Sequence, residues 1–155
     1  MIYVDIEKIV NEAVSLFPNL RGTKISNSCQ GLVVLADSLL RQLFYNLLDN
    51  TLKYGEKTTR IRIRYEITDG DQLRLVYEDN GVGIHAEEKL KLFREGYTTG
   101  KGSGYGLYLI GKMMEVYGWT IQENGVPGEG AQFIIAMPKT NPSGKENYHI
   151  ATVST

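Results

Sequence analysis

The stretch LRQLFYNLLDNTLKYG, residues 40–55, decides the fold, because its apolar residues recur at helical spacing. At roughly 100° of rotation per residue, Asn46 and Asn50 lie one turn apart on a narrow polar side, with Lys53 close to them. The large apolar side chains fall on the other side: Leu40, Leu43, Phe44, Leu47 and Leu48. We therefore predict a helix that packs one face on a sheet and presents carboxamides on the other.

The carboxamide pair has a chemical interpretation and a plain one. Asn forms helices poorly because its amide competes for backbone hydrogen bonds, so two Asn residues in mid-helix carry a small cost. Carboxamide oxygens suit a hard cation such as Mg²⁺, which also takes phosphate oxygens. Lys53, one turn further on, could then meet a phosphate. An ordinary solvated face is the alternative, and the spacing alone does not decide between the two.

The segments on either side of this helix alternate between helix and strand patterns. We expect the helix itself to begin at Ser38 after an Asp37 cap and to end at Gly55. Asp5 is placed to cap an earlier helix. We predict the remaining helices at 85–93 and 105–117, and strands in TKISNSC, LVVLA, TRIRIRYEIT, QLRLVYED, WTIQEN and AQFIIAMP. This order predicts an α+β fold, a mostly antiparallel sheet covered on one face by helices.

The strand LRLVYED ends in a second candidate site. Asp79 continues the face of Tyr77 at the end of this strand, and a turn containing Gly81 and Gly83 follows. Glycines there would let the backbone approach a ligand closely. The Asp79 carboxylate could accept hydrogen bonds from an exocyclic amine. A turn that only reverses the chain is the alternative.

The stretch GYTTGKGSGYGLYLI, residues 96–110, is rich in glycine but matches neither common phosphate motif. Its spacing differs from the P-loop pattern and from the G-x-G-x-x-G dinucleotide pattern. We predict a mobile segment that leads into a helix starting near Tyr105, whose free N–H groups could face an anion. We expect residues 94–103 to be the least ordered part of the domain without nucleotide. A plain flexible loop is the alternative.

Composition narrows the class of protein. The chain has 155 residues with a formal net charge of −1, so no basic surface points to nucleic acid or membrane lipid. A single cysteine excludes an internal disulfide and a Cys-rich zinc site. We expect a cytoplasmic domain at residues 1–138 and a flexible polar tail at 139–155. Whether a parent protein is anchored in a membrane is left open.

Together and in this order, the motifs resemble the ATP-binding catalytic domain of a sensor histidine kinase, within the superfamily of gyrase B subunits, heat-shock chaperone ATPases and mismatch-repair clamps. NLLDNTLKYG resembles the N box, DNGVGI the first glycine box, KLFREGY the F box and GSGYGL the second glycine box. The resemblance spans roughly residues 5–138. It implies a two-layer α/β sandwich with a mixed sheet, the Bergerat-type fold.

The resemblance also implies a role for each matching residue. Asn46 and Asn50 would work with Mg²⁺ and the phosphates of ATP, and Asp79 would read the adenine amino group. The other implied nucleotide contacts are Lys53, Tyr54, Gly81, Gly83, Ile84, Phe93, and the lid residues Lys101, Gly102, Ser103, Gly104, Tyr105, Gly106 and Leu107. Two departures stand out. Thr51 replaces the usual Ala, and the usual lid arginine is not evident, so Lys101 or Arg94 would have to replace its phosphate contact.

The chain has no histidine suited to receive a phosphoryl group. In the family that histidine is typically followed by Glu or Asp, whereas His85 precedes Ala86 and His149 precedes Ile150. We therefore expect the acceptor on a dimerisation domain outside this chain, in the same parent protein or in trans, with a response regulator acting downstream. The alternatives are an anti-sigma-factor type serine kinase, an ATP-driven clamp or chaperone ATPase, and a non-catalytic nucleotide-binding module. Relatives of the first two types generally carry Glu where this chain has Asn46.

Overall fold

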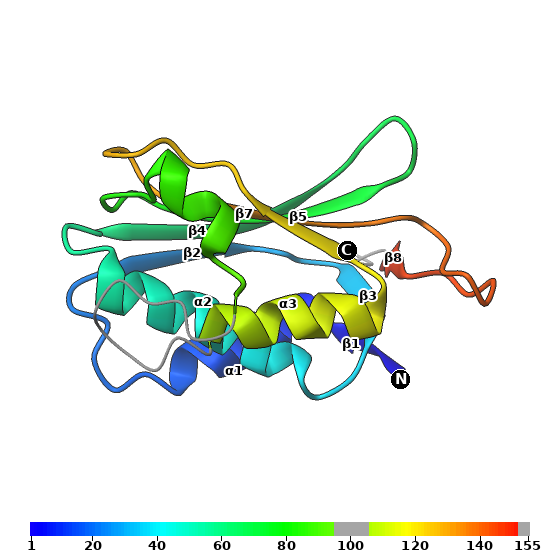
Figure 1. The fold of residues 1–155 in the computed structure, drawn as a ribbon. Coiled ribbons are helices and arrows are strands. Elements are labelled where there is room, and N and C mark those ends of the chain that lie inside the picture. Colours follow the sequence, from blue (N-terminus) through cyan, green and yellow to red (C-terminus); the bar gives the residue numbers. More distant parts are fainter. Residues whose placement is uncertain (95–105, 152–155) are drawn as a thin grey trace.

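The computed structural model describes residues 1–94 and 106–151, which form two sheets and a layer of helices (Figure 1). The larger sheet has the strand order β2-β4-β5-β7-β6. These strands span Lys24–Ser28, Arg60–Ile67, Leu73–Asp79, Gln132–Met137 and Thr120–Glu123, in that order. β2 runs parallel to β4, and the other pairings in this sheet are antiparallel. The prediction of a mixed, mostly antiparallel α+β fold is therefore confirmed.

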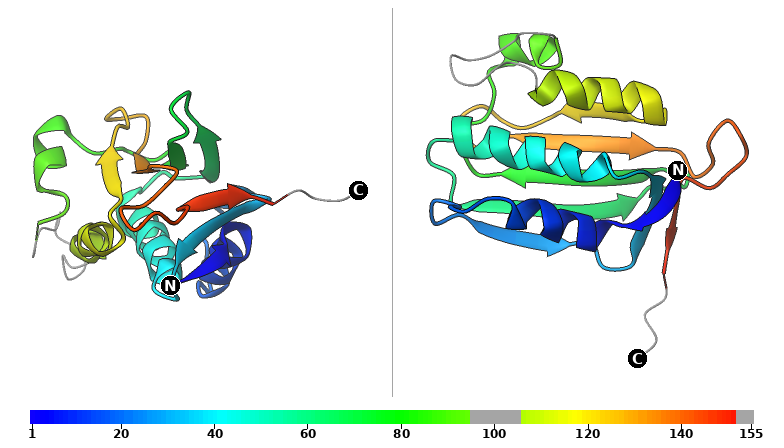
Figure 2. Two further views of the ribbon diagram at one scale, coloured as in Figure 1. Left: turned by 90° about the vertical axis from the view of Figure 1, so that its right-hand side faces the viewer. Right: turned by 90° about the horizontal axis from the view of Figure 1, so that it is seen from below.

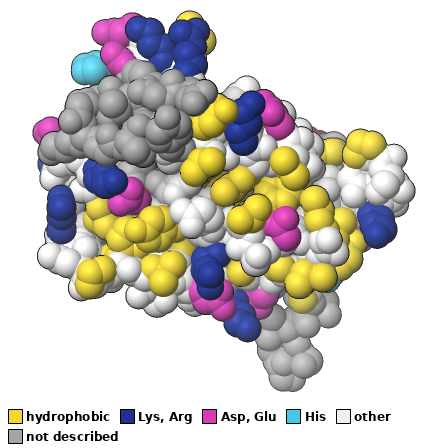
Figure 3. Space-filling view, turned by 60° about the horizontal axis from the view of Figure 1, so that its bottom comes forward, with side chains coloured by type: hydrophobic (Ala, Val, Ile, Leu, Met, Phe, Trp, Pro, Cys, Tyr) yellow, Lys and Arg dark blue, Asp and Glu magenta, His cyan; other side chains and the backbone are white. Residues whose placement is uncertain are grey.

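Three α-helices of the described residues cover one face of this sheet (Figures 1 and 2). They are α1 at Ile6–Ser15, α2 at Leu40–Tyr54 and α3 at Gly106–Tyr117. A short 3₁₀ helix, η1, spans Ala86–Lys91. Figure 3 shows hydrophobic side chains exposed among the charged ones on this helical side, and the exposed large hydrophobic residues on or next to the α-helices include Leu16, Leu39, Leu109 and Val116.

The apolar stripe of α2 lies in the core, as its spacing predicts. Leu43, Phe44, Leu47 and Leu48 are fully buried between the helix layer and the sheet. The predicted Asp37 cap is off by two residues, because Asp37 Oδ1 accepts a hydrogen bond from Leu39 N at 3.1 Å, in a turn that precedes the helix. Asp5 does cap α1, accepting from Lys8 N at 3.3 Å.

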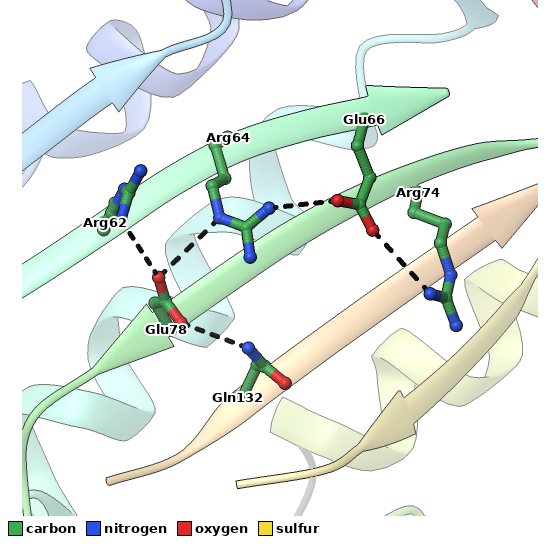
Figure 4. Close-up of polar contacts among 6 residues, drawn as sticks. All are labelled: Arg62, Arg64, Glu66, Arg74, Glu78 and Gln132. Carbon is green, nitrogen blue, oxygen red and sulfur yellow. Dashed lines mark hydrogen bonds and ion pairs between the residues drawn. The ribbon is translucent and has the colours of Figure 1, made fainter. Parts of the chain in front are cut away.

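The alternation of β4 and β5 separates a buried face of the sheet from an open one. Ile61 and Ile63 point into the core, while the neighbouring arginines lie on the open face. There Arg64 lies between Glu66 and Glu78, at 3.4 and 3.8 Å (Figure 4). The same close-up shows Arg62 beside Glu78, Arg74 beside Glu66, and Gln132 donating to Glu78. Ion pairs as exposed as these contribute little to stability.

The second sheet has the order β1-β3-β8, with both pairings antiparallel. Its strands span Ile2–Asp5, Leu32–Ala36 and Tyr148–Ile150. Two of them were not predicted: β1 precedes the first helix, and β8 falls in the segment expected to be a flexible tail.

The prediction of a flexible tail from residue 139 is wrong for the described residues 139–151. Tyr148 is 3% exposed, and its hydroxyl donates to Asp71 O at 2.6 Å. Asn147 is buried as well and donates to Pro138 O at 2.9 Å. A polar segment can therefore be fixed by two side chains that enter the body of the domain.

Among the described residues, no helix is both long and apolar enough to cross a membrane.

Candidate functional site

The candidate site lies where the C-terminal half of α2 meets the end of β5 and the start of α3 (Figure 1). Two hydrogen bonds join these elements. Asn46 Nδ2 donates to Gly106 O at 3.1 Å, and Thr51 Oγ1 donates to Asp79 Oδ2 at 2.8 Å. One helix thus contacts both the strand that ends in a carboxylate and the helix that follows the glycine-rich stretch.

The carboxamide of Asn46 is held in one orientation. Its amide nitrogen must face Gly106 O, because a carbonyl oxygen can only accept. Its Oδ1 therefore points the other way and accepts from Gln42 Nε2 at 2.8 Å. Asn46 is 8% exposed, and Asn50, one turn further on, is partly buried. A carboxamide oxygen has two lone pairs, so Oδ1 keeps one for a further contact.

Lys53 is engaged within its own helix. Its Nζ lies 2.9 Å from Asp49 Oδ2, and this hydrogen bond raises the pKa of the lysine. The ammonium group therefore stays charged, but it would have to leave Asp49 to contact a phosphate. Tyr54, the last residue of α2, is partly buried beside it.

The Asp79 carboxylate is fixed by backbone and side-chain donors. Oδ1 accepts from Gly81 N and from Ala131 N, both at 3.0 Å. Oδ2 accepts from Thr51. Two bonds from main-chain N–H groups leave the carboxylate little freedom to rotate. The acid at the end of β5 is therefore a preorganised hydrogen-bond acceptor.

The loop after Asp79 packs so closely that glycine is needed. A Cβ on Gly81 would lie 2.6 Å from Gly55 O, at the end of α2. Gly83 has a φ of +73°, and a Cβ there would lie 2.8 Å from Val126 O in the β6–β7 turn. Gly128 N donates to Val82 O at 2.7 Å across the same contact. The loop is thus held between the end of α2 and the β6–β7 turn.

The remaining predicted site residues divide into two groups. Ile84, Phe93 and Leu107 are partly buried against the core, and the Phe93 ring meets Phe133 edge-on at 6.4 Å. Gly106 is the residue that accepts from Asn46. The predicted lid residues Lys101, Gly102, Ser103, Gly104 and Tyr105 lie outside the described residues, and so does most of the segment predicted to be the least ordered.

Sequence reasoning missed several residues that support the site. Thr51 looked like a minor departure, yet it contacts both Asp79 and Tyr77. A lone hydroxyl on the apolar face of the helix was the available signal. Lys89 and Glu123 were also missed. Their 2.6 Å ion pair ties η1 to the end of β6, and no sequence pattern joins these two positions.

Comparison with known proteins gives consistent matches. The family model for histidine kinase-, DNA gyrase B-, and HSP90-like ATPases matches residues 36–141. The chain is 36% identical over 106 residues to the CAI-1 autoinducer sensor kinase/phosphatase CqsS of Vibrio cholerae. It is 35% identical over 120 residues to a probable C4-dicarboxylate sensor kinase of Bacillus subtilis. These alignments cover 67% and 76% of this chain but only 15% and 21% of the two relatives.

Solved structures agree with this fold. The catalytic domain of histidine kinase ThkA, in a nucleotide-free form, superposes with a TM-score of 0.72 at 26% identity, covering 91% of this chain and 100% of that one. Full-length ShkA in complex with AMPPNP has a TM-score of 0.75 at 24% identity, covering 97% of this chain and 31% of that one, and this likeness concerns the fold alone. The chain therefore belongs to the histidine kinase-, DNA gyrase B- and HSP90-like ATPase family, as an ATP-binding catalytic domain of the kind found in sensor histidine kinases.

Proposed function

We propose that this chain binds ATP with Mg²⁺ and transfers the γ-phosphoryl group to a histidine on a domain outside the chain. The observation that carries the proposal is the fixed Asp79 carboxylate, which stands at the end of β5 and is bonded to the carboxamide-bearing helix α2. Such an acceptor suits the exocyclic amine of adenine. The identity of the sensor kinase relatives supports the phosphotransfer half of the proposal.

The donor set on α2 fits a hard cation. Asn46 Oδ1 and Asn50 would hold Mg²⁺ together with phosphate oxygens, and the ion would neutralise charge on the phosphates. Lys53 would exchange its contact with Asp49 for a phosphate. Tyr54, Gly81, Gly83, Ile84, Phe93 and the segment 101–107 complete the proposed nucleotide site.

The chemistry that this chain supplies is positioning. Phosphoryl transfer needs an attacking atom in line with the leaving oxygen, and stabilisation of the charge on the phosphoryl group. The imidazole nitrogen of the acceptor attacks the γ-phosphorus and ADP leaves. His85 lies at the start of η1, and the His149 ring lies 5.1 Å from the Tyr3 ring at the second sheet, away from the C-terminal ends of α2 and β5 (Figure 1). We therefore place the acceptor on a partner domain, with a response regulator downstream, and the whole assembly in the cytoplasm.

Direct ATP hydrolysis, as in a clamp or chaperone ATPase, is the weaker alternative. Activating a water needs a general base, and a carboxamide cannot accept a proton at neutral pH. Asn46 stands where those relatives carry Glu, and both ends of its amide are already bonded. A serine kinase remains the other alternative, and the nature of the acceptor distinguishes it.

Calorimetry with Mg-ATP tests the nucleotide site. Asp79→Asn replaces one carboxylate oxygen, which can only accept hydrogen bonds, with an amide NH₂ group, which donates them. We therefore expect ATP affinity to fall about tenfold or more. Asp69→Asn is the matched control, because Asp69 is exposed in the β4–β5 turn. Unchanged ATP affinity in the Asp79 variant would remove the adenine-reading assignment.

A transfer assay tests the reaction. The chain is incubated with labelled ATP and candidate histidine-bearing dimerisation domains, and the product is treated with acid. Phosphohistidine loses its label in acid, whereas phosphoserine keeps it. Acid-stable label would support the serine kinase alternative, and release of phosphate without any protein label would support hydrolysis.

A further inference from the structure

The side chains behind Asp79 form a hydrogen-bonded row that the proposed function does not use. Thr51 Oγ1 lies 2.8 Å from Asp79 Oδ2 and 2.7 Å from the Tyr77 hydroxyl. The Tyr77 hydroxyl is also 3.1 Å from Leu47 O, inside α2. We propose that Thr51, supported by Tyr77, is a positioning residue that fixes Asp79 for a purine carrying a 6-amino group. The inference rests on the proposed function and adds the residue that sets the base preference.

Counting hydrogens gives the row a direction. An ionised carboxylate only accepts, so the single hydroxyl hydrogen of Thr51 must point to Asp79. The short contact between Thr51 and Tyr77 then needs the tyrosine as donor. Leu47 O does not need a hydrogen bond from the tyrosine, because a carbonyl inside α2 already accepts one from the helix backbone. The row therefore runs from Tyr77 to Thr51 to Asp79, and each hydroxyl is polarised toward the carboxylate.

The two carboxylate oxygens consequently have different roles. Oδ1 has two lone pairs and accepts from two backbone N–H groups, Gly81 and Ala131. Oδ2 accepts only from Thr51 among the described residues, so one of its lone pairs remains for a ligand. Asp79 is partly buried, whereas Thr51 and Tyr77 are each 2% exposed. Water cannot easily take the place of the Thr51 hydroxyl.

Burial keeps the tyrosine at the start of the row protonated. Removal of Tyr77 from water raises the pKa of its phenol well above the ordinary value, so it remains a donor throughout the working pH range. Hydrogen bonds in such a low-dielectric setting are stronger and polarise one another. An oxygen that can only accept favours an amine at purine position 6, and it gains nothing from a base that has no donor there.

The competing interpretation is that Thr51 only fills space. Thr51→Val tests this, because valine has nearly the same shape and lacks the hydroxyl. The change removes only the donor to Asp79 Oδ2, because Tyr77 can still donate to Leu47 O and Asp79 Oδ1 keeps both N–H donors. Thr51→Ser restores the hydroxyl without the methyl group. Thr23→Val is the matched control, since Thr23 is also buried but donates to Thr58 O and not to Asp79.

The experiment measures the affinity of the whole chain for two Mg-nucleotides, ATP and purine riboside triphosphate, which lacks the 6-amino group. The unmodified chain should prefer ATP by about tenfold or more, the value of one charge-assisted hydrogen bond. Thr51→Val should lose most of that preference, because its affinity for ATP falls and its affinity for purine riboside triphosphate does not. Thr51→Ser and Thr23→Val should keep the preference. Thermal unfolding of each variant verifies that it is folded.

The outcomes separate the two proposals. The positioning role would be overturned if Thr51→Val kept the preference for ATP, or if it lost affinity equally for both nucleotides. If Asp79→Asn weakens ATP in the same assay, the nucleotide site stands even when the Thr51 role fails. If Asp79→Asn has no effect, the proposed adenine contact itself is wrong. Loss of ATP preference in the valine variant with rescue by serine would establish Thr51 as the residue that positions Asp79.

Discussion

At the residue scale, main-chain segments approach one another closely in the site. Gly55 caps the C-terminus of α2, Gly81 comes two residues after Asp79, and Thr58 lies against both glycines. A Cβ on Gly55 would lie 2.6 Å from Thr51 O, and one on Gly81 would lie 2.6 Å from Gly55 O. Neither glycine has a positive φ. The need for glycine here comes from space and not from backbone conformation, and it sets the distance between Asp79 and α2.

Gly81→Ala should therefore push the loop after β5 away from α2. The clash is with backbone, which cannot swing aside, so we expect a loss of about 1–3 kcal/mol in the free energy of unfolding and weaker ATP binding. Denaturant melts and calorimetry measure both quantities. Gly70→Ala is the control, because a Cβ there meets nothing within 4 Å. Equal behaviour of the two variants would show that the loop can relax freely.

Cys29 offers a prediction about ionisation. The thiol is fully buried, and this burial, with a smaller effect from the charge of Glu7, raises its pKa from 9.0 to about 12. At pH 8 the folded chain should hold about 1000-fold less thiolate than the unfolded chain. A thiol-directed reagent should therefore react quickly only in denaturant. Rapid reaction of the native chain would contradict the burial.

The same shift has a defined effect on stability. Between pH 9 and about 12 the unfolded thiol ionises while the folded thiol keeps its proton. The unfolded state then binds fewer protons, so the stability that this group contributes is complete below pH 9 and falls as the pH rises. Comparison with Cys29→Ala isolates this contribution from those of lysine and tyrosine.

Single-residue roles were predictable only in part. The sequence singled out Asn46, Asn50 and Asp79 because two amides lie in mid-helix and an acid ends a strand before glycines, and their roles toward a nucleotide stay predictions. Thr51 and Tyr77 were not found, because their contact joins a helix to a strand 26 residues away. Helical periodicity shows which residues lie on the same face of a helix. It does not show which strand packs against that face.

At the scale of elements, η1 is fastened to the body of the domain by one buried carboxylate. The Glu123 side chain is 1% exposed, and its Oε2 accepts from Gly125 N and Gln132 N, both at 2.9 Å. Its Oε1 lies 2.6 Å from Lys89 Nζ, which also donates to Gly125 O. The glycine loop that follows Asp79 leads directly into η1, so this contact also restrains the loop.

Lys89→Ala should detach η1. The buried Glu123 would keep its two N–H donors but lose its counter-charge, which should cost about 1–3 kcal/mol of stability. Lys91→Ala, on the same short helix but exposed, should change the stability by less than about 0.5 kcal/mol. Hydrogen exchange of η1 amides reports the local effect. Equal protection in both variants would argue against the restraint.

Elements with strong periodicity were predicted well. β4 alternates strictly, β5 carries apolar residues along its core face, and the apolar stripe of α2 is wide, so their types and approximate limits follow from pattern alone. β1 was missed because Ile2–Asp5 runs straight into α1. β8 was missed because three residues in a polar segment have no periodicity, and only their contact with β3 makes them a strand.

At the scale of the whole molecule, β8 and the segment before it are part of the folded domain, because β8 pairs with β3 and Tyr148 is buried. Tyr148→Ala should remove a buried ring and its hydrogen bond to Asp71 O, at a cost of about 3–5 kcal/mol. Removal of residues 139–155 should destabilise the domain at least as much. Lys145→Ala, exposed in the same segment, is the control for both. Denaturant melts measure the differences in the free energy of unfolding. If the truncated chain were as stable as the whole chain, the segment after residue 138 would not contribute to the fold.

The pairing of β1 and β8 with the same strand has a topological consequence. Because β3 pairs antiparallel with both neighbours, β1 and β8 run parallel, and the start of β1, beside Ala36, and the end of β8, beside Leu32, lie at opposite ends of β3. Both ends of the described chain lie on the side of the molecule away from the C-terminal ends of α2 and β5 (Figure 1). A linker that joins these ends in a circular permutant would therefore have to run along β3. New ends could open at the exposed Asp69–Gly70 turn, between β4 and β5, without unpairing any strand. Such a permutant would leave α2, β5 and α3 uncut, and these are the elements that carry the proposed nucleotide site.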